Sequence, residues 1–89
     1  MKQIVVLGST GSVGCNALDV IKRNPNRFKV VGLAANDNYA LLSRQAKTFG
    51  VKEIAIYNKE RFKDLKGKVS VGVKVYVGLE GVLRIARLN

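Results

Sequence analysis

A glycine-rich segment near the N-terminus, Gly8-Ser9-Thr10-Gly11-Ser12-Val13-Gly14, has the residue types and spacing of a phosphate-binding turn. In turns of this kind one glycine allows a tight bend, a second lets the backbone approach a pyrophosphate, and a third lets a helix pack against a strand. The following helix offers free N–H groups to the phosphates, and Thr10 and Ser12 add hydroxyl donors. We therefore expect a dinucleotide at this turn, with a glycine turn that holds no ligand as the alternative.

A second group of polar residues, Asn36-Asp37-Asn38, follows the next apolar run. In a dinucleotide-binding fold the end of the second strand recognises the adenosine ribose. An acid there binds a free 2′-hydroxyl, whereas a basic or small polar group admits a 2′-phosphate. Asp37 lies at about the position expected of that acid. Asn and Asp also form turns and helix caps, so Asp37 and Asn38 have two possible roles, ligand contact and turn formation. One residue can have both roles at once.

Other chemistry is limited by the composition. The chain has no histidine, which excludes Ser-His-Asp catalysis, Cys-His catalysis and histidine metal sites within these 89 residues. Cys15 is the only cysteine and has no neighbouring base along the sequence, so we interpret it as a small packing residue rather than a nucleophile. The carboxylates are dispersed, and no catalytic or metal-binding residue is predicted.

The elements that must position these groups alternate along the chain. Short apolar runs predict strands at Gln3–Leu7, Phe28–Ala35, Glu53–Tyr57 and Val73–Val77. Helical spacing predicts helices at 13–21, Tyr39–Phe49, Lys59–Lys66 and 79–86. The first helix should end at Asn24-Pro25, and the second should begin at an Asn38 cap and end at Gly50.

This alternation predicts the α/β class, as a Rossmann-like three-layer α/β/α sandwich with a mostly parallel sheet. Residues 1–89 are expected to form one partial nucleotide-binding domain. In the doubly wound order 3-2-1-4 the first strand has a later strand as its second neighbour. We expect that neighbour to follow Asn89, which leaves Gln3–Leu7 at an open edge unless Val73–Val77 pairs with it.

The formal charge of +10 allows partners other than a dinucleotide, including nucleic acid. The charge is spread along the chain and the aromatic residues are scattered, so a basic nucleic-acid-binding module is the less favoured alternative. No apolar stretch reaches the length of about 18 residues that a membrane span needs, and the N-terminal run is too short for a signal peptide. We expect no membrane partner, and a cytoplasmic or plastid-stromal location.

Several segments taken together resemble the opening of the 1-deoxy-D-xylulose 5-phosphate reductoisomerase family. The matching residues are Leu7 to Gly14, Leu18-Asp19-Val20-Ile21, Asn24-Pro25, Phe28-Lys29-Val30-Val31, Leu33-Ala34-Ala35, Asn38, Leu41-Leu42 and, more weakly, Val77-Gly78-Leu79-Glu80-Gly81 and Ala86. The resemblance spans essentially the whole chain. The glycine motif alone is shared with many dehydrogenases, but the combination is specific.

The resemblance implies an enzyme of non-mevalonate isoprenoid biosynthesis. Such an enzyme isomerises and reduces 1-deoxy-D-xylulose 5-phosphate to 2-C-methyl-D-erythritol 4-phosphate with NADPH and a divalent metal, Mg or Mn, and it is expected to be a homodimer at full length. The positions implied to line the pyrophosphate are Thr10, Gly11, Ser12 and Val13. The positions implied to hold the adenosine ribose and its phosphate are Asn36, Asp37 and Asn38.

The sequence departs from that family in two ways. The family usually has glycine at the position of Asn36 and a small, polar or basic residue at that of Asp37, where an acid would repel a 2′-phosphate. We expect NADPH with reduced discrimination, because basic side chains such as Arg44 could reach the phosphate. The family also runs to several hundred residues, so the catalytic and C-terminal domains and the metal ligands are expected beyond Asn89, and these residues alone are not expected to catalyse.

Another NAD(P)-dependent oxidoreductase, similar to a semialdehyde dehydrogenase, remains the alternative enzyme. Its N-terminus would carry a similar glycine turn. A catalytic cysteine and histidine further along the chain would distinguish it from an enzyme with a carboxylate metal cluster.

Overall fold

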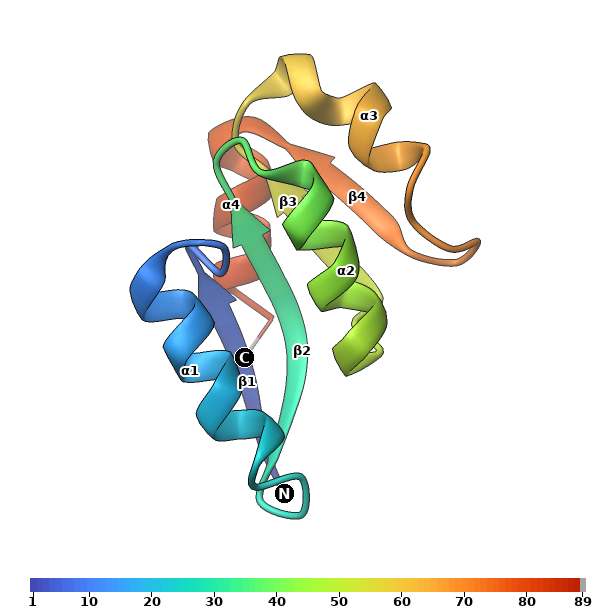
Figure 1. Ribbon diagram of the computed structural model, residues 1–89. Helices are drawn as coiled ribbons and strands as arrows, with labels where there is room; N and C mark the ends of the chain where they lie inside the picture. The colour runs from blue at the N-terminus through green and yellow to red at the C-terminus, as the bar shows by residue number, and fades with distance from the viewer. Residues whose placement is uncertain (89) are drawn as a thin grey trace.

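The computed structural model describes residues 1–88, which form a sheet of four strands with helices between them (Figure 1). The strands are β1 (Lys2–Leu7), β2 (Phe28–Ala35), β3 (Glu53–Ile56) and β4 (Lys74–Val77). The helices are α1 (Ser12–Lys22), α2 (Tyr39–Phe49), α3 (Phe62–Lys66) and α4 (Gly78–Ala86), with a short 3-10 helix, η1 (Lys59–Arg61), before α3. The predicted α/β class and the alternation of elements are confirmed.

All three strand pairs are parallel, and the strand order is β1-β2-β3-β4. Within residues 1–88, β1 pairs with β2 alone, so the prediction that Gln3–Leu7 lies at an open edge is confirmed. The alternative, in which Val73–Val77 pairs with the first strand, is wrong. β4 instead pairs with β3, at the opposite edge of the sheet.

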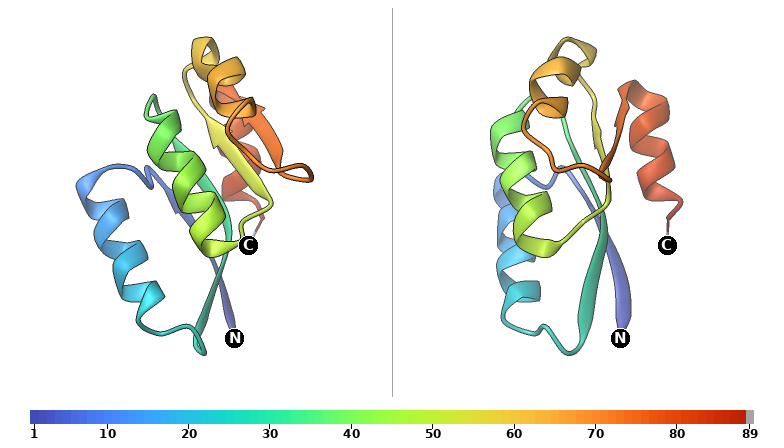
Figure 2. Two further views of the ribbon diagram at one scale, coloured as in Figure 1. Left: turned by 45° about the vertical axis from the view of Figure 1, so that its right-hand side comes forward. Right: turned by 90° about the vertical axis from the view of Figure 1, so that its right-hand side faces the viewer.

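The sheet lies between two layers of helices, as the Rossmann-like prediction requires. Figure 2 shows α1, α2 and α3 on one face of the sheet and α4 on the other. Right-handed crossovers explain this division. The strands β1 to β4 are added in one direction, which places the connecting helices on one face, whereas α4 leaves β4 on the opposite face and packs across β3, β2 and β1.

Burial on both faces explains why the strands are almost continuously apolar. Leu33, Ile54 and Ile56 are fully buried in the larger core, beneath the α1 to α3 layer. On the other face, Ile85 of α4 is fully buried against the sheet. A Cβ atom on Gly32 would come within 3.0 Å of the Ile85 Cγ2 atom, so the absence of a side chain at this glycine lets α4 pack closely against β2.

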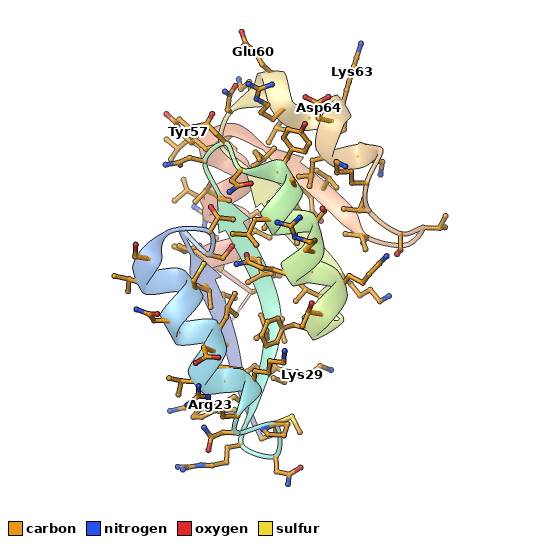
Figure 3. All side chains as sticks on the ribbon, in the orientation of Figure 1. Arg23, Lys29, Tyr57, Glu60, Lys63 and Asp64 are labelled. Atoms are coloured by element: carbon orange, nitrogen blue, oxygen red, sulfur yellow. The ribbon has the colours of Figure 1, made fainter. Side chains whose placement is uncertain are left out.

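The helix ends follow the predicted signals, with one difference. α2 has Asn38 as its N-cap and ends at Gly50, whose φ of 66° is left-handed. The helix predicted at Lys59–Lys66 is divided into η1 and α3, because the Asn58 side chain accepts a hydrogen bond from the Glu60 amide (3.0 Å) and tightens the first turn. Glu60 and Lys63 project away from the molecule, so this charged run is a solvated helix surface (Figure 3).

Candidate functional site

The carboxyl ends of parallel strands meet at one edge of a sheet, which is where α/β proteins bind ligands. Here that edge carries the glycine-rich turn after β1, the polar turn after β2, the Tyr57–Lys59 segment after β3 and the start of α4 (Figure 1). Exposed apolar side chains gather there: Leu7, Val13, Tyr57 and Leu79 are each about half exposed or more. Exposed apolar surface beside polar groups indicates a binding edge.

The glycine-rich turn is built by the backbone. Gly8 has a φ of 69°, a left-handed conformation that favours glycine. The Ser9 amide donates to the Ala34 carbonyl (2.9 Å) and the Gly11 amide donates to the Gly8 carbonyl (3.1 Å), which fixes the bend against β2. A Cβ atom on Gly14 would lie only 2.2 Å from the Gly8 carbonyl oxygen, so α1 packs against the turn as the sequence predicted.

The N-terminus of α1 is open above this turn. Gly11 is the N-cap, no side chain among residues 1–88 caps the helix, and the first bond along the helix runs from the Cys15 amide to the Gly11 carbonyl (2.8 Å). Helix geometry therefore gives the amides of Ser12, Val13 and Gly14 no acceptor within α1. Ser12 and Val13 are exposed, so this turn presents N–H groups and a positive dipole end to solvent.

Gly11 leaves room for a ligand. A Cβ atom there would meet the Gly8 carbonyl oxygen at an ordinary contact distance of 3.5 Å, and the Gly11 backbone is extended. The fold itself therefore tolerates a side chain at this position. A glycine is required here only if another molecule approaches the backbone.

Beneath the turn lies a small polar cluster that the sequence analysis missed. Gln45 of α2, only 8% exposed, donates from Nε2 to the Ser9 carbonyl oxygen (2.9 Å). The half-buried Cys15 thiol donates weakly to the carbonyls of Ser9 (3.6 Å) and Thr10 (3.7 Å), in agreement with the packing role predicted for it. The available signal was that Gln45 is polar yet lies three residues after Leu42, on the apolar face of α2.

The second predicted group forms a turn held by side chains. The Asn38 Oδ1 atom accepts a hydrogen bond from the Leu41 amide (3.1 Å), so its predicted cap role is confirmed. The Asp37 Oδ1 atom accepts from Asn58 Nδ2 at 2.6 Å, and the Asn58 amide donates to the Asn36 carbonyl (2.9 Å). Asn58 was also missed, since it lies 21 residues from Asp37 in sequence and only the β2–β3 pairing brings the two together.

A cavity of about 700 Å³ opens beside this second turn. It is lined by Asn36, Asp37, Tyr57, Asn58, Lys59, Glu60, Gly78 and Leu79. Lys59 is the basic residue of this lining, and its stem lies against Gly78. Arg44 lines a different groove, between α1 and α2, whereas Lys59 lines the same cavity as Asp37.

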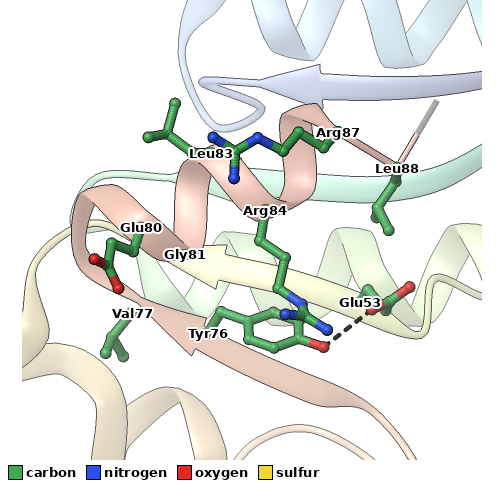
Figure 4. Close-up of a pocket in the computed structure, with 9 residues that line it drawn as sticks. All are labelled: Glu53, Tyr76, Val77, Glu80, Gly81, Leu83, Arg84, Arg87 and Leu88. Atoms are coloured by element: carbon green, nitrogen blue, oxygen red, sulfur yellow. Dashed lines mark hydrogen bonds between the residues drawn. The ribbon is translucent and has the colours of Figure 1, made fainter.

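Another cavity, of about 730 Å³, lies between α4 and the strands β3 and β4 (Figure 4). The Tyr76 hydroxyl donates to the Glu53 carboxylate (3.0 Å), and the Arg84 guanidinium lies 4.8 Å from the centre of the Tyr76 ring. These polar groups interact with one another, and the lining contains none of the predicted cofactor residues. The candidate site is therefore the carboxyl edge of the sheet.

Two further observations bear on the predicted chemistry. Within residues 1–88, no three His, Cys, Asp or Glu side chains lie close enough together to hold a metal ion. The same part of the chain contains no helix that is long and apolar enough to cross a membrane.

Known proteins match the chain over nearly its full length. The family model of 1-deoxy-D-xylulose 5-phosphate reductoisomerase matches residues 4–89. The reductoisomerase of Thermodesulfovibrio yellowstonii is 42% identical over 89 residues, and that of a Wolbachia from Brugia malayi is 43% identical over 89 residues. The matches cover 99% or more of this chain but 23% of each relative, so the chain spans about a quarter of their length.

Solved structures agree. The Zymomonas mobilis reductoisomerase in complex with NADPH superposes with a TM-score of 0.92 at 33% identity, over 98% of this chain and 23% of that one. A reductoisomerase in complex with NADPH, fosmidomycin and magnesium gives a TM-score of 0.89 at 27% identity, over 97% and 22%. With the family model matched over nearly all of its residues, the chain belongs to the 1-deoxy-D-xylulose 5-phosphate reductoisomerase family.

Proposed function

We propose that residues 1–89 form the N-terminal NADPH-binding domain of a 1-deoxy-D-xylulose 5-phosphate reductoisomerase. The observation that carries the proposal is the pair of exposed residues, Ser12 and Val13, whose amides have no acceptor within α1, above a turn where Gly11 leaves the backbone accessible. Such an array binds phosphate through hydrogen bonds and the helix dipole together. Structures of relatives determined with NADPH support this choice of ligand.

In this proposal the pyrophosphate lies over the glycine-rich turn. Its oxygens accept hydrogen bonds from the amides at the start of α1 and from the hydroxyls of Thr10 and Ser12. Val13, which is 84% exposed, packs against an apolar part of the cofactor and so loses its contact with water. The backbone supplies most of the donors, so binding requires little ordering of side chains.

The adenosine end of the cofactor lies at Asn36, Asp37 and Asn38, with the cavity beside them taking part of the nucleoside. Asp37 repels a 2′-phosphate, whereas Lys59, from the same cavity, attracts it. Glu60 adds a further negative charge to the lining. We infer NADPH as the cofactor, with weaker discrimination against NADH than a basic residue at position 37 would give.

The activity belongs to the longer protein that this family membership implies. That enzyme converts 1-deoxy-D-xylulose 5-phosphate to 2-C-methyl-D-erythritol 4-phosphate, and its Mg or Mn ligands and catalytic residues lie outside these residues. The bound NADPH supplies the hydride, and the residues described here bind and orient it. We further propose a cytoplasmic or plastid-stromal homodimer without a nucleic-acid partner. Membership of the family favours the reductoisomerase activity over that of an enzyme similar to a semialdehyde dehydrogenase.

The test is a titration of the chain with NADPH, followed by amide resonances in NMR spectra. We expect the largest shifts at Thr10, Gly11, Ser12 and Val13. Gly11→Val should abolish these shifts and weaken binding at least about 100-fold, because a bulky side chain keeps the phosphates away from the backbone. The variant should remain folded, since a Cβ atom at this position meets only an ordinary contact. Unchanged Thr10–Val13 resonances in the parent chain would contradict the proposal.

A further inference from the structure

We propose that Gln45 is a positioning residue for cofactor binding. In this inference, which rests on the proposed function, the Gln45 amide holds the peptide between Ser9 and Thr10 so that its N–H faces the pyrophosphate. Gln45 itself touches no ligand. It acts from the buried side of the turn, and it comes from α2, the helix that follows the second strand rather than the first.

The geometry at the Ser9 carbonyl carries the argument. This oxygen accepts from Gln45 Nε2 at 2.9 Å, and the Cys15 thiol adds a weaker contact at 3.6 Å. A peptide is planar and trans, so its C=O and N–H groups point in opposite directions. A Ser9 carbonyl held toward the interior by Gln45 therefore turns the Thr10 N–H outward, toward the face where the amides of Ser12 and Val13 are open.

The burial of Gln45 shows that this hydrogen bond determines its placement. Gln45 Oε1 and Ser9 Oγ are both buried without a hydrogen-bond partner among residues 1–88. A buried polar atom without a partner destabilises a fold, so a side chain chosen only for packing would be apolar here. Its neighbours on the same face of α2, Leu42 and Ala46, are apolar and buried. The amide is accommodated despite its unpaired oxygen because its nitrogen holds the turn.

The same helix also carries the second turn of the site. Asn38 caps α2, and Gln45 lies seven residues later, two turns along the helix. α2 therefore links the polar turn after β2 with the glycine-rich turn after β1 as one rigid element. Loss of the Gln45 amide should weaken binding of the pyrophosphate and leave binding of the adenosine end unchanged. A general displacement of α2 should weaken binding of both parts of the cofactor.

This difference gives the experiment. In the full chain, Gln45→Met keeps the size of the side chain and removes the donor. We expect the Kd for NADPH to rise about 5- to 10-fold, as for the loss of one neutral hydrogen bond. The Kd for adenosine 2′-monophosphate, which has no pyrophosphate, should stay within about twofold of the parent value. The NADPH-induced shift of the Thr10 amide should decrease in the same variant.

Leu42→Ala is the matched control, because Leu42 is fully buried on the same face of α2 and makes no hydrogen bond to the turn. It should lower the Tm without changing the ratio of the two Kd values. If Gln45→Met does not fold, Gln45→Leu decides the same ratio, since it too is apolar like its neighbours on this face of α2 and has no donor.

Equal losses for both ligands, or an unchanged ratio, would overturn the positioning role while leaving the proposed function intact. A parent chain that binds neither NADPH nor adenosine 2′-monophosphate would overturn the proposed function, and this inference with it.

Discussion

The two turns at the carboxyl edge of the sheet are built by different means. The turn from Gly8 to Gly14 is mainly a backbone structure: its bends depend on glycine, main-chain hydrogen bonds close it, and no side chain among residues 1–88 caps the helix above it. Side chains support it from beneath, where Gln45 and Cys15 donate to its carbonyls. The turn at Asn36–Asn38 is a side-chain structure, in which Asn38 caps α2 and Asp37 accepts from Asn58. The first belongs to the edge strand β1 and the second to β2, which has a partner on each side.

This difference separates affinity from selectivity. Backbone amides recognise any phosphate and cannot be changed by substitution without changing the turn itself. Side chains can be exchanged while the turn survives, so the second site can change its ligand preference from one relative to another. We therefore expect substitutions in the first turn to have large effects on fold or binding, and substitutions in the second to shift only the choice between cofactors.

The largest effect should come from Gly14. Gly14→Ala places a Cβ atom 2.2 Å from the Gly8 carbonyl oxygen and 2.7 Å from the Ser9 Cα atom, and both are backbone atoms that cannot move aside. We expect a loss of about 3 kcal/mol in the free energy of unfolding, at the upper end for overpacking. Urea unfolding measures it. Gly11→Ala is the matched control and should cost about 1 kcal/mol or less. Equal losses would show that the close approach at Gly14 is not what requires glycine.

Strand position should give the next largest effect. In the 89-residue chain, the amides of Ile4 to Leu7 in β1 should exchange with solvent about 30-fold faster than those of Leu33 and Ala34 in β2, because edge strands open locally at lower cost. The free edge is also a template for association, so we expect self-association through β1 despite the +10 charge. Hydrogen exchange and sedimentation measure the two effects. A monomer in which the β1 amides are as protected as those of β2 would contradict the edge argument.

The strand order illustrates how far sequence can predict this fold. The alternation of apolar runs and helical spacing predicts an α/β sheet, and it locates each strand to within one residue at either end. The sequence did not predict the position of β4, because the residues of a strand do not determine which edge of the sheet it joins. That choice depends on the direction of the crossover formed by η1 and α3.

The site shows the same limit. The glycine spacing predicted the first turn because the requirement is local, within seven residues. Gln45 and Asn58 were missed because their partners, Ser9 and Asp37, lie 36 and 21 residues away in sequence. Only the packing of α2 and the pairing of β3 with β2 bring each pair together. A polar residue on an apolar helix face was the one signal available, and it indicated Gln45.

In the second turn, Asp37 should have the largest effect on cofactor choice. Asp37→Ser removes a negative charge beside the expected 2′-phosphate and keeps a small polar group. We expect the ratio of NADPH to NADH affinity to rise about 10-fold, or about 1.4 kcal/mol, which is close to the Coulomb energy of two charges about 4 Å apart that are well exposed to water. Calorimetry with both cofactors measures the ratio. Glu60→Gln is the control, because it removes a charge on the rim of the same cavity. It should change the ratio of NADPH to NADH affinity less than Asp37→Ser does. A parent chain with a clear preference for NADH would contradict the inferred choice of NADPH.

The smallest effect should come from Asn58, which acts through Asp37. Asn58→Ala removes the 2.6 Å hydrogen bond to Asp37 Oδ1 but leaves the carboxylate charge in place. A free carboxylate must be ordered again before it can bind a ribose 2′-hydroxyl, so NADH should bind about threefold more weakly. NADPH should be affected less, since the released side chain can turn away from the phosphate. The Asp37→Ser, Asn58→Ala double variant tests whether the two residues act as one unit. If they do, Asn58→Ala should add nothing once Asp37 is replaced, whereas independent residues would give additive changes in binding free energy. Additivity would mean that Asn58 contributes through its other side-chain hydrogen bond, which it accepts from the Glu60 amide, and that the carboxylate is oriented without it.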